Sequence, residues 1–495
     1  MSPYRFSSVA LVLASIGSFP VATSAAWSDM GTLPQGDICI GMDINDQGNA
    51  VGTCRDEDED LVPVYWPRAQ PPRLLPPLEA DALCDAEAIG NDGTIAGNCQ
   101  DDDGEFFPVR WSTATSVPSA PQRLSALPLH VKSGSVLVNH LGIVAGYSIS
   151  NAGAIRAVIW KRDQVSATAL PELGPLPPLL PASIGCEVTD MTNGASPLIT
   201  GVCSLRVGGS VAVRWVPTGL GGAYVVHTLR PLAPDSSCAA IAINDSGQVA
   251  GHCESAANDL AAVRWESDGT MLAVLNRVEG VFPQQLQVID MNASGRIVGQ
   301  YLTASGRTSA FVWMPVENPD LEAAADLGNL GGFSTSVTAI ADNNAAIGSA
   351  QDDVGAIRAV IGGATLIDLG TLPGGLASQA IAISDSGRHL VGISQNAEGQ
   401  FRAVRQERSD KKMEQPSVPR KEPAQIHYSV LSSGSGRDMV GGTTNTYRTM
   451  YQFFTFKRSK TIAVRAKSAY IDANLWSLIR QSPMSGILVG RKDGI

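Results

Sequence analysis

The sequence predicts an all-β protein, a β-propeller of about eight four-stranded blades. Two recurring landmarks carry this prediction. A short strand-like run ending in tryptophan recurs at intervals of 45 to 55 residues, at Trp66, Trp111, Trp160, Trp215, Trp265 and Trp313. A second landmark, of the type Ile44-Asn-Asp-Gln-Gly-Asn-Ala-Val-Gly52, precedes each tryptophan and gives eight copies between Trp27 and Arg405. Repeats of this length, each with four short strands, are typical of propellers, and a stacked β-solenoid is the alternative.

Composition agrees with many short strands joined by turns. The chain of 495 residues contains 50 glycines and 30 prolines, and only 17% of its residues are charged. An average protein has about 25% charged residues, so this chain is poor in the Glu/Lys faces of solvated helices. Because 44% of the residues are apolar, the chain can bury a large core, which argues against general disorder.

The first 26 residues have the layout of a secretory signal peptide. One basic residue, Arg5, precedes an apolar stretch from Val9 to Pro20, and small residues follow up to Ala26. The alternative is an N-terminal membrane anchor, for which the apolar stretch is short. No later segment offers 18 consecutive apolar residues. We therefore expect an exported chain, periplasmic or extracellular, with no transmembrane segment after processing.

Each repeat reads as four strands, most clearly in the fifth copy, where they cover 226–232, 238–244, 248–253 and 261–265. We expect the strand before Asn-Asp-x-Gly to be innermost, followed by the Val-Gly strand, the Trp strand and an outer Asp-Leu-Gly-Thr-Leu strand. The first outer-type strand, 29–33, has no blade of its own, while the last copy lacks an outer strand. The N-terminal strand should therefore complete the eighth blade and close the ring.

The eight cysteines fit one hairpin disulfide in each of four repeats. In chain order they form pairs separated by 15, 15, 17 and 15 residues. If Asn45 lies opposite Gly48 across its turn, counting back along both strands places Cys39 opposite Cys54. The same count gives the pairs 84–99, 186–203 and 238–253, from Cys84, Cys99, Cys186, Cys203, Cys238 and Cys253. A zinc site is the alternative, but C-x-x-C spacing is absent.

Two late repeats resemble a known family. The run Asp368-Leu-Gly-Thr-Leu-Pro-Gly-Gly375, followed by Ser378-x-Ala380 and Val391-Gly392-x-Ser394, resembles the bacterial HAF extracellular repeat family. Asp326-Leu-Gly-Asn-Leu-Gly-Gly332 is a second close copy, and the resemblance covers roughly 27–405. The His-Ala-Phe tripeptide itself is replaced, for example by Arg-Ala-Val at 402–404. The resemblance implies an exported bacterial repeat protein and implies no particular activity.

The C-terminal part differs in charge from the repeats. The whole chain has a net charge of -11. Residues 406–425 are charged and contain prolines, which is typical of a linker, and 426–495 form a basic C-terminal region. Ser435-Gly-Arg-Asp-Met-Val-Gly441 echoes the repeat, so a degenerate ninth unit is an alternative to a count of eight. A short helix with one apolar face is predicted from Ile471, Leu475, Leu478 and Ile479. It would pack against the protein itself, a partner or a membrane surface.

Acidic loops are the candidate binding residues. Asp56, Asp58 and Asp60 follow one Val-Gly strand, and Asp101, Asp102 and Asp103 follow the next. These loops should share one face with the segments that lead into the inner strands. Three interpretations remain open: a solvated acidic surface, a calcium site made by these six carboxylates, and a surface for a basic partner such as the chain's own tail. Apart from calcium, no cofactor is expected.

These features favour an exported binding scaffold without catalytic residues. No histidine lies in a recognisable nucleophile arrangement. The expected partner is an extracellular protein or glycan, and no nucleic acid. The alternative is a propeller hydrolase or lyase acting on an extracellular polymer, which should place two or more carboxylates or a histidine in the mouth of the central channel.

Overall fold

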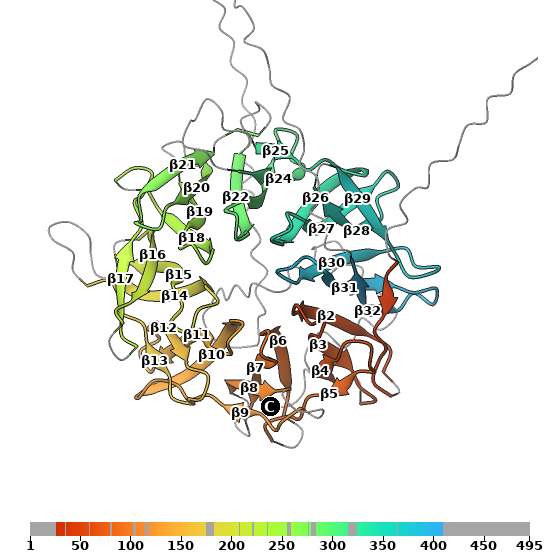
Figure 1. Ribbon diagram of the computed structural model, residues 1–495, viewed down its shortest axis with the longest axis horizontal. Helices are drawn as coiled ribbons and strands as arrows, with labels where there is room; N and C mark the ends of the chain where they lie inside the picture. Colours follow the sequence, from red (N-terminus) through yellow and green to blue (C-terminus); the bar gives the residue numbers. More distant parts are fainter. Residues whose placement is uncertain are drawn as a thin grey trace, which may run out of the picture.

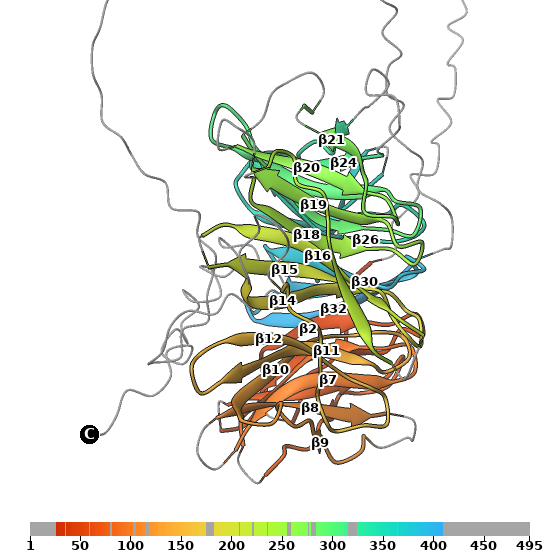
Figure 2. The same cartoon turned by 90° about the vertical axis from the view of Figure 1, so that its left-hand side faces the viewer.

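The computed structural model describes residues 26–408 except 35, 59, 80–81, 102–104, 114–117, 175–182, 207, 220–221, 235, 255–258, 276, 279–283, 315–323 and 364. Its strands form eight four-stranded antiparallel sheets, arranged as blades around one axis (Figure 1). The ring is a disc, which Figure 2 shows from its edge. The predicted propeller of eight blades is confirmed. The signal peptide and the C-terminal predictions lie outside the described residues.

Every blade has the predicted strand order from the axis to the rim. The first four blades contain β2 (Cys39–Ile44), β3 (Ala50–Arg55), β4 (Leu61–Trp66) and β5 (Arg73–Leu74); β6 (Cys84–Ile89), β7 (Thr94–Gln100), β8 (Phe106–Ser112) and β9 (Gln122–Arg123); β10 (His130–Val138), β11 (Val144–Ser150), β12 (Ile155–Trp160) and β13 (Thr168–Ala169); and β14 (Ser183–Met191), β15 (Ile199–Leu205), β16 (Ser210–Pro217) and β17 (Tyr224–Thr228).

The next three blades repeat this order, and the eighth borrows its outer strand from the N-terminus. They contain β18 (Cys238–Ile243), β19 (Val249–Glu254), β20 (Leu260–Trp265) and β21 (Met271–Leu275); β22 (Gln284–Met291), β23 (Ile297–Leu302), β24 (Thr308–Trp313) and β25 (Ala324–Asp326); β26 (Gly331–Ile340), β27 (Ala346–Asp352), β28 (Ile357–Gly362) and β29 (Leu366–Gly370); and β30 (Ser378–Ile383), β31 (His389–Gln395), β32 (Phe401–Glu407) and β1 (Ser28–Asp29).

The N-terminal strand closes the ring, as predicted. In β1, Asp29 pairs with Val404 of β32, and the Met30 amide donates to the Ala403 carbonyl over 3.0 Å. The side chains of Trp27 and Met30 are buried on either side of this pairing. β32 runs to Glu407, two residues beyond the predicted end of the propeller at Arg405. The N-terminal residues of the same chain therefore complete the eighth blade and close the ring.

The hairpin register differs from the prediction beside the turn. The Gly48 amide donates to Asn45 O over 2.9 Å, and the Asn45 amide donates to Asn49 O over 3.0 Å. Gly48 has a φ of 78°, so Gly48 and Asn49 together oppose Asn45 as a bulge. Ile44 consequently faces Ala50, one position away from the predicted partner. A second bulge in β2, between Gly41 and Asp43, restores the predicted register.

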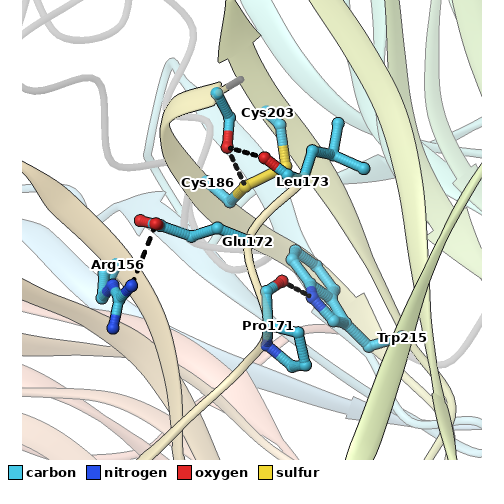
Figure 3. The surroundings of a disulfide bond; sticks show 8 residues. Arg156, Pro171, Glu172, Leu173, Cys186, Cys203 and Trp215 are labelled. Carbon is cyan, nitrogen blue, oxygen red and sulfur yellow. Dashed lines mark hydrogen bonds and ion pairs between the residues drawn. A yellow bond between two sulfur atoms is a disulfide. The ribbon is translucent and has the colours of Figure 1, made fainter. Parts of the chain in front are cut away.

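This second bulge occurs in the inner strand of all eight blades. Because the two bulges compensate each other, all four predicted disulfides form, with Cα–Cα distances of 4.0 to 4.1 Å. Figure 3 shows the Cys186–Cys203 bond in the fourth blade. In the third blade, which has no cysteines, Ser133 faces Ser148 at the corresponding position. Four disulfides are consistent with an exported protein.

The tryptophan landmark ties five of the blades to the segment that precedes them. Five indole nitrogens donate to main-chain carbonyl oxygens of the segment that precedes their own blade, over 2.7 to 3.3 Å. Trp215 donates to Pro171 O, for example, over 2.8 Å (Figure 3). The arginine before the tryptophan ties in the other direction, since Arg214 donates to Gly247 O of the following blade over 3.1 Å. These recurring residues are therefore part of the architecture.

The core lies between neighbouring blades. One buried cluster joins Val136 and Leu137 of the third blade to Cys186 and Val188 of the fourth. Buried aspartates add polar links between inner strands. Asp190 Oδ2 accepts the Ile243 amide of the next blade over 2.8 Å, and Asp43 and Asp290 repeat this contact. Within the described ranges, no helical segment has the length and hydropathy needed to cross a membrane.

Candidate ligand-binding site

The two ends of the ring differ in construction. We call the end that carries the Asn-Asp-x-Gly turns the turn face. The other end, the loop face, carries the loops between second and third strands and the segments that lead into the inner strands. On both faces the inner strands surround the axis (Figure 1). A ligand that approaches the axis must therefore pass the side chains at one of these two faces.

Side chains of opposite blades meet across the axis at the turn face. His140 of the third blade places Nε2 3.2 Å from Asp385 Oδ2 of the eighth blade. Asn193 of the fourth blade donates to the same oxygen over 3.5 Å. In a ring of eight, the fourth and eighth blades lie diametrically opposite each other. These contacts therefore obstruct the turn-face mouth of the channel.

The turn tips also tie neighbouring blades together around this mouth. Ser386 N donates to Asp46 Oδ1 over 2.9 Å across the closure, and Asp46 N donates to Asn91 Oδ1 over 2.9 Å. Asn193 N donates to Asp245 Oδ1 over 2.9 Å in the same way. Burial alone would lower the pKa of His140, but the hydrogen bond and charge of Asp385 raise it above its ordinary value. The carboxylates on this face thus serve structural links and hold His140 in place.

A separate group of titratable side chains lies on the axis side of the second to fourth blades. Asp85 and Glu87 belong to the inner strand β6, and Glu187 belongs to the inner strand β14. Tyr147 comes from β11 in the blade between them and faces Gly134 of β10. A Cβ atom on Gly134 would lie 2.6 Å from the Tyr147 hydroxyl, so only glycine leaves room for this ring over the inner strand.

Electrostatic coupling links the three carboxyl groups to Tyr147 and links Asp85 to Glu87. Burial raises the pKa of Tyr147 to about 12, and the charges of Glu87, Asp85 and Glu187 contribute. Burial also raises the pKa of Asp85 to about 6, against the hydrogen bonds from Asn98. The pKa of Glu87 lies well above its ordinary value because of burial and the charge of Asp85. Two enclosed carboxyl groups that repel each other can share one proton at neutral pH.

Local structure explains how these groups are held. Glu87 occupies the bulge of β6, between Ala86 and Ala88, and bulges redirect side chains. Asp85 accepts the Asn98 amide over 2.7 Å, while Asn98 Oδ1 accepts the Ser135 amide of the next blade over 3.0 Å. Asp85 and Glu87 keep partial access to solvent. The channel cluster, Asp85, Glu87, Tyr147 and Glu187, can therefore bind a cationic or hydroxyl-bearing group or exchange a proton with it.

The predicted acidic loops lie on the loop face but form no metal site among the described residues. Asp56 Oδ1 accepts the Asp58 and Asp60 amides, each over 3.0 Å, so it caps its own turn. Asp101 accepts the Glu105 amide over 3.1 Å and lies 3.5 Å from Arg123. Asp102 and Asp103 lie outside the described residues. In the described ranges, no group of three or more His, Cys, Asp or Glu is arranged to hold a metal. Calcium binding by these loops stays a prediction.

The loop face carries an excess of carboxylates. Its ion pairs join Asp37 to Arg55, Glu105 to Lys132, Glu172 to Arg156, Asp352 to Arg358 and Asp101 to Arg123. Within the described part of the chain, further carboxylates on this face have no ion pair: Asp56, Glu57, Asp58, Asp60, Glu254, Asp353 and Glu398. Fewer described bases on this face are without an ion pair: Arg206, Arg230, Arg307 and Arg402.

The same face exposes most of the large apolar side chains that reach solvent. They are Leu61, Leu83, Leu129, Val131, Ile184, Phe333, Val354 and Leu376. Leu129 is 91% exposed and has a φ of 67°, a conformation that L-residues rarely adopt. Val354 is 81% exposed beside Asp353. Exposed apolar residues rimmed by charge are characteristic of interaction surfaces.

Sequence reasoning missed the channel cluster, although one signal was present. Applied to the third repeat, the count that pairs Cys39 with Cys54 would place Gly134 opposite Tyr147, as the structure does. A glycine that faces an aromatic residue on an inner strand indicates that the aromatic ring crosses it. The carboxylates of this cluster, Asp85, Glu87 and Glu187, were not singled out from the sequence. The carboxylates that were singled out lie in loops after the second strands, whereas those of the cluster lie on the inner strands themselves.

Comparisons with known proteins find structures of similar fold, but no protein that is similar in sequence. No family model matches the sequence, and no curated protein is similar to it. A solved Mycobacterium tuberculosis puromycin-hydrolyzing peptidase aligns with 12% identity and a TM-score of 0.37, over 56% of this chain and 42% of that chain. Prolyl oligopeptidase B from Galerina marginata aligns with 7% identity and a TM-score of 0.40, over 66% and 46%.

A fungal lectin, that of Aleuria aurantia, is described as a six-bladed β-propeller. It aligns with 11% identity and a TM-score of 0.28, over 57% of this chain and 93% of the lectin. The present chain spans less than half of the puromycin-hydrolyzing peptidase. At these identities the likeness concerns the fold alone, and the assignment of eight blades rests on the strand pairing described above. The resemblance to HAF repeats stays a prediction.

Proposed function

We propose that this chain is an exported, non-catalytic binding scaffold whose loop face captures a positively charged polypeptide segment that also carries apolar side chains. One observation carries the proposal: unpaired carboxylates and most of the exposed apolar residues occupy the same face. The recurring Asn, Asp, Arg and Trp residues are engaged in links between blades. The loops of the loop face vary from blade to blade, as expected of residues selected for a partner.

Charge steering gives this proposal a salt dependence. Unpaired carboxylates attract a basic segment over about one Debye length, roughly 10 Å at 0.1 M salt. The apolar residues then add burial at about 25 cal/mol for each Å² removed from water. We therefore expect association to weaken with salt while part of the affinity survives at high salt.

A fluorescently labelled peptide of lysine and leucine is a suitable probe, measured by anisotropy against residues 27–408. This fragment contains the closed ring and all four disulfides, so it holds its complete core. The combined change Asp56→Asn, Asp58→Asn and Asp60→Asn should lower affinity about tenfold, at roughly 0.5 kcal/mol per exposed charge. The control Asp163→Asn with Asp268→Asn on the turn face should change it less than twofold.

An equal loss in the control would refute a loop-face site. Binding of the peptide without salt dependence would refute the role of the carboxylates. Binding of a neutral oligosaccharide, with none of the peptide, would replace the polypeptide partner by a glycan. At low salt, a peptide of glutamate and leucine should bind much more weakly than the peptide of lysine and leucine, because the carboxylates repel it.

The alternative, a propeller hydrolase or lyase acting on an extracellular polymer, is supported by the channel cluster. A protonated carboxyl beside an ionised one is the arrangement that general acid–base catalysts use. Under this alternative, Glu87→Gln and Asp85→Asn would each abolish turnover of a polymer and leave the melting temperature near that of the native chain. The control Glu398→Gln, on the loop face, would keep full turnover. If the native chain turns over none of a panel of polysaccharides and peptidoglycan, the enzyme alternative is rejected and the binding scaffold is retained.

A further inference from the structure

We propose that the chain's own C-terminal segment 457–480 is a ligand of the loop face. This inference rests on the proposed function, because it assigns an occupant to the same surface. The segment lies outside the described residues, so its sequence and the described face carry the argument. Its bases are Lys457, Arg458, Lys460, Arg465, Lys467 and Arg480, against one acid, Asp472.

The segment complements the loop face both in charge and in apolar side chains. Its six bases match the unpaired carboxylates of the loop face. On the turn face, Arg162 pairs with Asp92 and Arg264 pairs with Glu266. Its apolar residues Ile471, Leu475, Leu478 and Ile479 would share one helical face, as the loop-face apolar residues require. A segment that was only basic, or only apolar, would match half of this surface.

The length of chain between the two parts permits the contact. The propeller ends at the turn face, where Arg408 N donates to Arg388 O over 2.7 Å. A strand of seven residues such as β32 spans roughly 23 Å, which approximates the thickness of the disc. About 50 residues separate Arg408 from the segment, and a flexible chain of that length has a root-mean-square span of roughly 40 Å. The segment can therefore pass the rim and reach the loop face of its own ring.

Tethering makes the segment a competitor for outside partners. A tether of about 50 residues that can reach the face gives an effective concentration on the order of 1 mM. If the free segment binds with a Kd of about 100 μM, the tethered segment lowers the apparent affinity for another basic ligand about tenfold. The full chain would thus be self-inhibited until a partner displaces the segment or proteolysis in the linker releases it.

Zero-length carbodiimide crosslinking of the full chain tests the contact directly, since it joins lysines to carboxylates that touch. We expect crosslinks from Lys457, Lys460 and Lys467 to loop-face carboxylates such as Asp58, Asp353 and Glu398. These crosslinks should be lost at about 0.5 M salt, because exposed charges more than about 4 Å apart are then screened. The turn-face carboxylates Asp163 and Asp268 provide the internal control. A mixture of isotopically light and heavy chains shows whether the segment binds its own ring or that of a second copy.

The second measurement is the affinity of the lysine-leucine peptide for the full chain. Removal of 409–495, or Lys457→Glu with Arg458→Glu and Lys460→Glu, should raise this affinity about tenfold, as the competition above requires. The control Arg437→Glu with Arg448→Glu, outside the segment, should leave it unchanged. Crosslinks to both faces alike, or unchanged affinity on removal of the tail, overturn the inference.

The outcomes separate this inference from the proposed function. If the peptide binds residues 27–408 through the loop face but the tail gives no crosslinks there, the inference fails and the scaffold stands. If the peptide binds neither form, both fail. If the tail instead binds vesicles containing anionic lipid and leaves the loop face free, the segment is a membrane-surface element and the inference is wrong.

Discussion

Loss of the Met30 side chain should open the ring at a defined place. Met30 is 6% exposed and packs in a cluster with Val64 of the first blade and Val391 and Ala403 of the eighth. The change Met30→Ala keeps the main-chain bond to Ala403 and removes only this packing. Large-to-small changes of this kind cost about 2–5 kcal/mol. β1 has only two residues, so few hydrogen bonds, each worth about 1 kcal/mol, remain to hold the strand.

The assay is urea unfolding combined with hydrogen exchange measured by mass spectrometry. The matched control is Leu369→Ala, which removes a side chain that is 4% exposed on the outer strand β29 of an uninterrupted blade. Both variants should lose about 2–5 kcal/mol of unfolding free energy. Only Met30→Ala should accelerate exchange in β32, β31 and β2, the strands on either side of the closure.

Two results would refute this reasoning. A loss below about 1 kcal/mol would show that the cluster collapses onto the vacated space at little cost. Faster exchange confined to β1, with β32 and β2 still protected, would show that the ring holds together without its N-terminal strand.

Three further predictions concern a disulfide, a buried histidine and the acidic loops. Replacing Cys186 and Cys203 by serine opens a loop of 17 residues and should cost about 3 kcal/mol in thermal unfolding; a cost under about 1 kcal/mol would mean that the hairpin alone holds the register. His389 is buried, and burial with nearby arginines lowers its pKa, so the folded state loses stability as the pH falls below about 6.5, the ordinary histidine value. His389→Leu should flatten the fall in melting temperature from about pH 7 to pH 5, and an unaltered profile would contradict this. Calorimetric titration with Ca²⁺ should show heat that Asp101→Asn, Asp102→Asn and Asp103→Asn together abolish; no heat in the native chain rejects the calcium site.

The architecture could be predicted from sequence because its determinants are local and repeated. Hairpin turns, tryptophan strands and cysteine spacing recur in each copy, and each repeat restates the same pairing. The count placing Cys39 opposite Cys54 assumed a turn without a register shift. It succeeded because two bulges in the same hairpin compensate each other. Sequence pattern cannot reveal such compensation, since the bulged residue is Met42 in one blade and Glu87 in the next.

Of the two candidate sites, the acidic loops could be predicted from the sequence and the channel cluster could not. The acidic loops are visible as runs of aspartate, and their common face follows from strand order. The channel cluster unites residues of β6, β11 and β14, which lie in three different blades. Asp85 and Glu87 alternate with small residues there, which is the ordinary pattern of a strand with one buried side. Their meeting with Tyr147 depends on ring curvature, which no single repeat encodes.

The closure by β1 also dictates an order of assembly. Each disulfide hairpin joins residues 15 to 17 positions apart, whereas Asp29 and Val404 meet from nearly opposite ends of the propeller. Chain-entropy scaling makes that closure roughly 3 kcal/mol more costly than a single hairpin. Individual blades and their cystines therefore come first, and the N-terminal strand is docked last. If the chain is exported from its N-terminus, this strand stays unpaired until the eighth blade has crossed, and the part that is translocated earliest then completes the molecule.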